Sequence, residues 1–254
     1  MIARPRGSTI VRSLARTGAL ALVCACASVS STPGSDAIAI VGVTVIDPSS
    51  SAPATPDQTI LISDGVIRAV GPLASVDIPA GTRRVDGRGK FAIPGLWDAH
   101  VHFMNAGVSA LPLFVASGVT SVREMGGYAS STADVRRMHE MGVNILAGTD
   151  AGSVLVYPGF GLHEELQRLV EDAKLSPRDA LWSATVGPAR FARLDDQLGT
   201  LSRGKIADVV LLDADPLTNI RNTRRIFAVI QAGRFFSRAD LDALLAQVRA
   251  AAAH

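Results

Sequence analysis

The sequence contains very little cysteine, which excludes most thiol chemistry. Its two cysteines, Cys24 and Cys26, both lie near the N-terminus, in a stretch typical of a removable export signal. Removal of that stretch leaves at most one cysteine, so the mature chain has no internal disulfide and is a poor candidate for thiol catalysis. The apolar core of this leader, Ala19 to Val23, is too short to span a bilayer permanently.

The leader contains no acidic residue, so the net charge of the whole sequence differs from that of the chain without the leader. The chain of 254 residues carries 25 Lys and Arg against 23 Asp and Glu, a formal charge of +2. Without the four leader arginines, 21 basic groups face 23 acidic groups, and the formal charge becomes −2. This balance gives no indication of nucleic-acid binding. With 48% hydrophobic and 19% charged residues, the sequence suits a globular protein with one sizeable core.

Residues 1–36 predict an export signal followed by a tether. Residues 1–27 begin with basic side chains, continue with a short apolar core and end in small residues. Two processing routes stay open: a signal-peptidase cut at Ala25-Cys26-Ala27, or a lipoprotein signal in which Cys26 becomes the acylated first residue. Residues 28–36, rich in serine, predict a flexible tether. We therefore expect an exported protein, either periplasmic or lipid-anchored at a bacterial membrane.

Two regions far apart in the sequence, 37–90 and 200–236, predict one small β domain. Asp64-Gly65 is a strong two-residue hairpin signal in the first region, and Ala232-Gly233 marks a turn in the second. The first region is expected to form a small antiparallel sheet. The strands expected in the two regions are Ile38 to Ile46, Thr59 to Ser63, Val66 to Val70, Asp208 to Leu212 and Ile226 to Gln231.

Between residues 91 and 199, apolar strands alternate with helices, which is the pattern of βα units. The expected strands are Phe91 to Ala99, Val119 to Glu124 and Val143 to Thr149. The expected helices are Ser109 to Ala116, Ala133 to Met141, Glu164 to Ala173 and Arg178 to Thr185. Ser176-Pro177 supplies an N-cap and a first helical residue for the last of these. Residues 237–254 predict a C-terminal surface helix.

His100 and His102 follow the first of these strands. Side chains two residues apart on a strand point to the same face, so both imidazoles enter one volume. Asp150 follows the third strand, and in a barrel of parallel strands the C-terminal strand ends share one rim. Two imidazoles and a carboxylate there would form a metal site with open positions for water. The alternative is two histidines at a strand end that contact only water.

Four segments carry recognisable motifs: IPGLWDAHVH at 93–102, GVTSVREMGG at 118–127, LAGTDAG at 146–152 and LGTLSRGKIAD at 198–208. Together they resemble the metal-dependent amidohydrolase superfamily, in its imidazolonepropionase-like and prolidase-type branch. The resemblance implies an α/β fold. Its parts are a TIM-barrel-like core and a small β-sandwich-type domain that both ends of the chain form around it.

The resemblance also implies an activity, the hydrolysis of C–N bonds in non-peptide amides, cyclic amides or dipeptides by a metal-activated water. His100, His102 and Asp150 match the positions that hold a divalent metal, zinc being the expected ion. Asp150 matches the carboxylate that takes a proton from the attacking water and passes it to the leaving nitrogen. His163, in the loop after Asp150, is a further candidate for the substrate rim.

Most of the expected barrel is missing from the sequence. A closed eight-stranded barrel takes about 250 residues, and at least about 200, whereas residues 91–199 are roughly half of that length. Members of this branch also carry a carbamylated lysine that bridges two metals and two further metal-binding histidines. No lysine lies between Lys90 and Lys174, and the two histidines have no convincing counterpart. The incomplete barrel leaves a second hypothesis open, an inactive exported remnant or binding module produced by internal deletion.

The expected partners follow from these features. A small-molecule substrate is implied by the resemblance, and nucleic acid is not expected. Membrane attachment would occur through a lipidated N-terminus. A homo-oligomer could supply the missing barrel wall, but the sequence offers no specific support for one.

Overall fold

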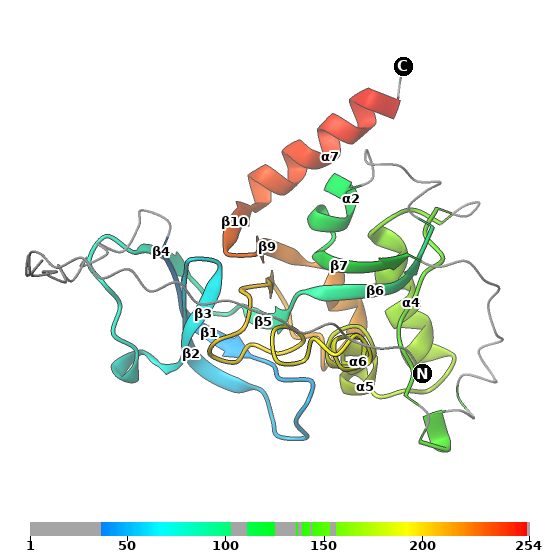
Figure 1. The fold of residues 1–254 in the computed structure, drawn as a ribbon, viewed down its shortest axis with the longest axis horizontal. Coiled ribbons are helices and arrows are strands. Elements are labelled where there is room, and N and C mark those ends of the chain that lie inside the picture. The colour runs from blue at the N-terminus through cyan, green and yellow to red at the C-terminus, as the bar shows by residue number, and fades with distance from the viewer. Residues whose placement is uncertain are drawn as a thin grey trace, which may run out of the picture. The chain divides into compact units, whose positions relative to one another are not determined.

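The computed structural model describes residues 37–102, 111–124, 136, 139–142, 144–152 and 156–252. The leader, the tether and Cys26 lie outside the described residues, as does most of the helix expected at Ala133 to Met141. Within the described part of the chain, no helix is both long and apolar enough to cross a membrane. This part is a mixed α/β structure (Figure 1).

The strands are β1 (Ile38–Val45), β2 (Thr55–Ser63), β3 (Val66–Pro72), β4 (Arg83–Asp86), β5 (Phe91–Pro94), β6 (Leu96–Val101), β7 (Val119–Glu124), β8 (Val209–Leu212), β9 (Ile226–Gln231) and β10 (Arg234–Ser237). The helices are α2 (Leu111–Ala116), α4 (Phe160–Glu171), α5 (Pro177–Ser183), α6 (Val186–Phe191) and α7 (Arg238–Ala252). Two 3₁₀ helices, η1 (Leu73–Ser75) and η3 (Ile220–Arg224), complete the described elements.

The larger sheet combines strands from both ends of the chain. Its order is β10-β9-β8-β5-β1-β2-β3, and β4 pairs with β1. The two ends meet where β5 pairs antiparallel with β8. Within the N-terminal region, β1 pairs antiparallel with β2 but parallel with β4 and β5. The expected antiparallel sheet of this region is therefore mixed. The strands from the two ends of the chain belong to one eight-stranded sheet, and the predicted β-sandwich-type domain is not confirmed.

The structure contains both predicted turns, and Asp64-Gly65 has the backbone that its sequence favours. Asp64 and Gly65 have φ values of +53° and +73°, so both central residues of the hairpin are left-handed, as a type I′ turn requires. Ala232 and Gly233 have φ values of +48° and +82°. The second turn leads into β10, which the sequence analysis did not predict. Its presence extends the sheet by one strand beyond β9.

The predicted strand from Phe91 to Ala99 is wrong as a single element, because Gly95 divides it. The amide of Gly95 donates to the carbonyl of Asp208 at 2.9 Å, outside both flanking ladders. A Cβ at this position would lie 2.2 Å from Oγ1 of Thr120, so the close approach requires glycine. The chain therefore leaves the composite sheet after β5 and enters a second sheet as β6.

The second sheet is parallel and carries the two histidines at its end. It pairs β6 with β7, and the bounds of β7 match the predicted Val119 to Glu124. Figure 1 shows α4 and α2 beside these two strands. On its other side, β6 is accompanied by residues 144–151, which donate to and accept from its backbone.

Strand β8 lies between two hydrophobic cores because its alternate side chains face opposite sides. Val209 and Leu211 belong to the core inside the composite sheet, with residues of β1 and β2. Val210 and Leu212 belong to the larger core that includes residues of β6, α4 and α5. All four β8 side chains are fully buried, so the short strand joins the composite sheet to the layer that holds the histidines.

Helices α5 and α7 start close to the predicted residues. Ser176 caps α5, since its hydroxyl accepts from the amide of Asp179 and Pro177 occupies the first helical position. At the start of α7, the amide and hydroxyl of Ser237 both donate to Oδ2 of Asp240. The expected surface helix therefore starts close to the predicted residue.

Arg178 on α5 forms hydrogen bonds with the loop after β1. Its Nη1 donates to the carbonyls of Asp47 and Ser50 at 2.8 and 2.6 Å, and its Nη2 donates to Ala52 at 2.8 Å. Replacement of Arg178 by methionine should lower the free energy of unfolding by about 2 kcal/mol, because it removes the charged group that donates hydrogen bonds to three carbonyls.

Chemical denaturation would measure this loss, with exposed Arg203 as the matched Arg→Met control. Lysine at position 178 should recover only part of the stability, because its ammonium lacks the fork that spans separate acceptors. Equal stabilities of R178M and R203M would contradict this account of the loop.

Candidate metal centre

The structure brings His100, His102 and Asp150 together. One ligand atom from each residue lies within 4.8 Å of the other two. Oδ1 of Asp150 is 2.5 Å from Nε2 of His102 and 3.4 Å from Nε2 of His100. The two imidazole centroids are 5.4 Å apart, at 62° between their planes. The side chains are 25%, 22% and 36% exposed in sequence order, so solvent reaches the cluster.

Backbone hydrogen bonds hold the segment of Asp150 against β6. The amide of Ala99 donates to Ala147, and the amide of Asp150 donates to His100 at 2.7 Å. The amide of His102 then donates to Ala151. These bonds alternate in direction between the two segments, so residues 48 to 50 apart in sequence are fixed at neighbouring positions.

The third predicted strand, Val143 to Thr149, is extended but is not a regular strand. Val143 lies outside the described residues, and residues 144–149 carry no strand assignment. Just after them, an isolated parallel bridge joins Val101 and Ala151. Asp150 itself has φ +63°, a left-handed backbone that interrupts strand geometry. The segment therefore turns at Asp150, where a straight strand was expected.

Glycines make the close approach of this segment possible. A Cβ on Gly148 would lie 2.5 Å from Cβ of His100. A Cβ on Gly152 would lie 2.2 Å from the carbonyl oxygen of His102, and Gly152 has φ +101°. Both positions therefore require a residue without a side chain if the histidines are to stay where they are.

The residues present fit a divalent metal ion. Nε2 of His100 and Oδ1 of Asp150 are buried atoms without a hydrogen-bond partner, and the contact of Asp150 with His102 is close but lacks hydrogen-bond geometry. Buried polar atoms are rarely left unpaired, so the convergence of these two acceptors fits the binding of a cation. Imidazole nitrogen and carboxylate oxygen are donors that zinc accepts, in a set that leaves positions open.

Two further carboxyl groups have raised pKa values, Asp98 beside the cluster and Glu165 within charge interaction of Asp98, and neither was predicted from the sequence. Burial raises the pKa of Asp98 to about 6, although hydrogen bonds from Thr149 and His100 lower it. Burial also raises the pKa of Glu165 on α4 to about 7, and the negative charge of Asp98 adds to this shift. A lone carboxylate inside the apolar run of β6 was the signal that could have identified Asp98, since such a group needs partners when buried.

His163 does not lie on a substrate rim, and this corrects the sequence analysis. It belongs to α4, is 3% exposed, and both of its ring nitrogens have partners. Nδ1 contacts the hydroxyl of Thr223 at 3.1 Å, and Nε2 contacts the carbonyl of Ser117 at 2.9 Å. The apolar face of α4 turns this residue toward the core, where it joins α4 to the end of α2 and to η3.

Burial lowers the pKa of His163 to about 4, the contact with Ser117 opposes this shift, and the charge of Arg224 adds to it. The folded pKa lies below the unfolded value, so the unfolded chain binds more protons between these two pKa values. The stability contribution is therefore complete above the unfolded pKa and is lost as the pH falls toward the folded one.

Relative to His163→Gln, the wild type should lose about 2 kcal/mol of unfolding free energy between pH 7.5 and 5. Urea denaturation of both proteins at the two pH values measures the difference, and the variant cancels contributions from other groups. Parallel pH profiles for the two proteins would contradict a buried neutral histidine.

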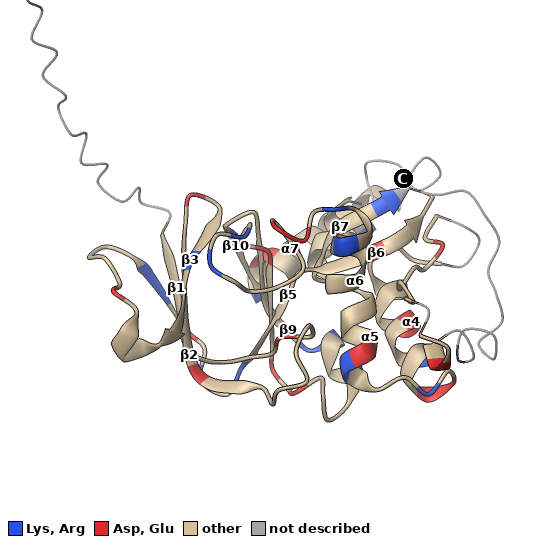
Figure 2. Ribbon diagram, turned by 60° about the horizontal axis from the view of Figure 1, so that its bottom comes forward, with Lys and Arg blue, Asp and Glu red and all other residues tan. Residues whose placement is uncertain are grey.

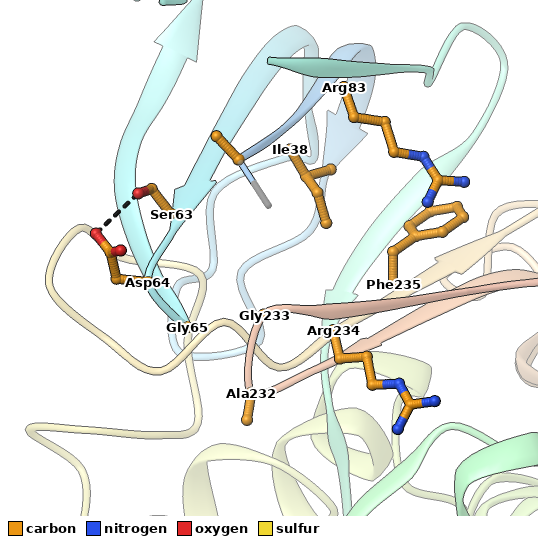
Figure 3. A pocket seen from close by; sticks show the side chains of 10 residues that line it. Ile38, Ser63, Asp64, Gly65, Arg83, Ala232, Gly233, Arg234 and Phe235 are labelled. Atoms are coloured by element: carbon orange, nitrogen blue, oxygen red, sulfur yellow. Dashed lines mark hydrogen bonds between the residues drawn. The ribbon is translucent and has the colours of Figure 1, made fainter. Parts of the chain in front are cut away.

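A cavity lies elsewhere in the described residues, in the composite sheet. It has a volume of about 510 Å³ and lies beside the turns at Gly65 and Gly233 (Figure 3). The guanidinium of Arg83 lies 4.2 Å from the ring centroid of Phe235 at this cavity. Its described lining residues include no histidine or cysteine, and the carboxylate of Asp64 is paired with Arg68 at 2.6 Å. The lining of this cavity therefore lacks the set of metal-ligand side chains that the three-residue cluster has.

Charged residues of both signs are mixed over the visible elements, and Figure 2 shows basic and acidic positions next to each other on α5. Arg178 and Asp179 are such a pair.

Comparison with known proteins identifies similar sequences over part of the chain. The sequence profile of the amidohydrolase family matches residues 128–234. An imidazolonepropionase of Salinispora tropica is 29% identical over 154 residues, which cover 55% of this chain and 38% of that protein. A 5-methylthioadenosine/S-adenosylhomocysteine deaminase of Caldanaerobacter subterraneus is 31% identical over 133 residues, covering 49% of this chain and 30% of the relative. The chain thus matches well under half the length of these curated relatives.

The fold has similar solved structures. A Bifidobacterium longum protein assigned as a prolidase aligns with a TM-score of 0.69 over 84% of this chain and 99% of that chain, at 21% identity. At this identity the similarity concerns the fold alone.

Proposed function

We propose that this chain, which belongs to the amidohydrolase superfamily, hydrolyses C–N bonds of small molecules with water activated by a divalent metal ion. The observation that carries the proposal is the convergence of two imidazoles and one carboxylate within 4.8 Å at the end of a parallel strand. The family profile and the curated relatives support C–N bond hydrolysis as the reaction class. Zinc is the proposed ion because its usual ligands include imidazole and carboxylate.

His100 and His102 would bind the ion. Asp150 would contribute a further ligand oxygen and would also transfer the proton of the attacking water. When bound, such an ion lowers the pKa of a water molecule toward neutrality. Asp150 would accept the proton of the attacking water through a carboxylate that is 36% exposed. The oxygen of that water forms the new bond to carbon, the C–N bond breaks, and Asp150 returns the proton to the leaving nitrogen.

The substrate class is proposed from the relatives, whose names include an imidazolonepropionase, a dihydroorotase and a deaminase. We infer a small molecule with an amide, cyclic amide or ring C–N bond, or a dipeptide. Export through the N-terminal leader, with or without a lipid on Cys26, is part of the same proposal. It would place this activity outside the cytoplasm.

A second candidate function is a catalytically inactive remnant or binding module. The observation that favours it is the size of the parallel layer, which in the described residues contains β6, β7 and the segment 144–151. A closed barrel of this type has eight strands. Such a remnant could keep the histidines and the carboxylate without turning over a substrate.

One experiment distinguishes the two candidates. Protein expressed in zinc-supplemented medium should contain about one divalent ion per folded chain, measured by elemental analysis. The loaded protein should hydrolyse at least one member of a panel of dipeptides and cyclic amides, and chelation should abolish the activity. Bound metal without turnover would favour the remnant, and undetectable metal would eliminate the metal-dependent proposal.

A further inference from the structure

Asp98 is a fully buried carboxylate two residues before His100 on β6. Its Oδ1 accepts from the amide of Thr149 at 3.0 Å and from the amide of His100 at 3.3 Å. Its Oδ2 accepts from the hydroxyl of Thr149 at 2.6 Å. One side chain therefore binds the backbone of both segments that carry the three converging residues.

Thr149 extends this connection to the far side of Asp150. Its hydroxyl oxygen, while donating to Asp98, accepts from the amide of Ala151 at 3.0 Å. The residues on both sides of Asp150 are thus fixed to one carboxylate, directly at Thr149 and through a hydroxyl at Ala151. This matters because Asp150 adopts a left-handed backbone, φ +63°, which is costly for a residue other than glycine.

We propose that Asp98, acting with the hydroxyl of Thr149, is the positioning residue that sets the spacing of His100 and Asp150 for metal binding. The inference rests on the proposed metal site. Asp98 does not belong to the three-residue cluster, so its effect is on the placement of the ligands. Partners that orient metal ligands typically change metal affinity by about 10- to 100-fold when they are removed.

The test is the zinc affinity of the folded protein, measured by competition with a chromogenic chelator, beside the thermal stability of each metal-free variant. Thr149→Val removes the hydroxyl and should weaken zinc binding by about 10- to 100-fold. Thr149→Ser keeps the hydroxyl and should restore affinity close to that of the wild type. Asp98→Asn keeps one acceptor oxygen for the two amides, so it should weaken binding less than Asp98→Ala.

The matched control is Thr185→Val. Thr185 is buried, whereas Thr149 is half-buried, and the hydroxyl of Thr185 donates to the carbonyl of Leu181 at 2.6 Å, outside the three-residue cluster. This variant should lose stability but keep its zinc affinity, which separates a positioning role from a general loss of packing. The comparison of Thr149→Val with Thr149→Ser tests the positioning role even if Asp98→Ala does not fold.

The outcomes separate this inference from the proposed function. Wild-type zinc affinity in folded T149V and D98A would overturn the positioning role and leave the metal site intact. No zinc uptake by the wild type would overturn the metal site, and this inference with it. Weakened binding in T149V, recovered in T149S and absent from T185V, is the result we expect.

Discussion

Replacement of Asp150 by asparagine is expected to lower the rate of hydrolysis by about 10²- to 10⁴-fold, the range over which general acid–base groups contribute. Asparagine has nearly the same shape and keeps an oxygen that can face the ion, but its amide cannot accept a proton from water. Metal content should therefore stay near that of the wild type. Steady-state rates on a substrate from the panel, together with elemental analysis of the same sample, measure both quantities.

Asp77, an exposed carboxylate of the composite sheet region, provides the Asp→Asn control. D77N should match the wild type in both rate and metal content. If D150N kept full activity, Asp150 would not be the proton-transferring group. Loss of both metal and activity would show that the carboxylate of Asp150 is needed to hold the ion, contrary to the expected metal content.

Replacement of Gly152 by alanine is expected to weaken both the fold and the metal site. The added Cβ would lie 2.2 Å from the carbonyl oxygen and 2.9 Å from the carbonyl carbon of His102, at φ +101°. These are backbone atoms, so no side-chain rotation relieves the contact. We expect a loss of more than about 2 kcal/mol in unfolding free energy, with lower zinc affinity because His102 must move.

The substitution Gly204→Ala serves as the control that separates backbone strain from the contact with His102. Gly204 has φ +91°, and a Cβ there would meet nothing within 4 Å, so G204A carries the backbone strain without the contact. G204A should cost about 1 kcal/mol and leave zinc affinity unchanged. Denaturation curves and chelator competition on both variants test this, and equal effects of the two substitutions would contradict the packing of Gly152 on His102.

Much of the fold could be predicted because its elements follow local patterns. The Asp64-Gly65 turn, the β7 strand and the cap of α5 each depend on residues close together in sequence. The break at Gly95 could not be predicted locally. It results from a close contact with Thr120 and a hydrogen bond to Asp208, which lie far along the chain.

The same distinction applies to the candidate site. The placement of His100 and His102 follows from strand alternation, and that of Asp150 from the shared edge of parallel strands. The role of His163 was predicted incorrectly, because sequence position alone does not show that its α4 face points toward Ser117 and Thr223. The contacts of Asp98 needed the folded pairing of β6 with the segment that contains Thr149.

The central claim is that two imidazoles and one carboxylate bind a common ion, and the zinc K-edge X-ray absorption spectrum of the zinc-loaded protein tests it most directly. We predict scattering from two imidazole ligands together with oxygen ligands, and loss of one imidazole contribution in His100→Asn and in His102→Asn. An all-oxygen shell, or a spectrum that neither substitution changes, would contradict the account.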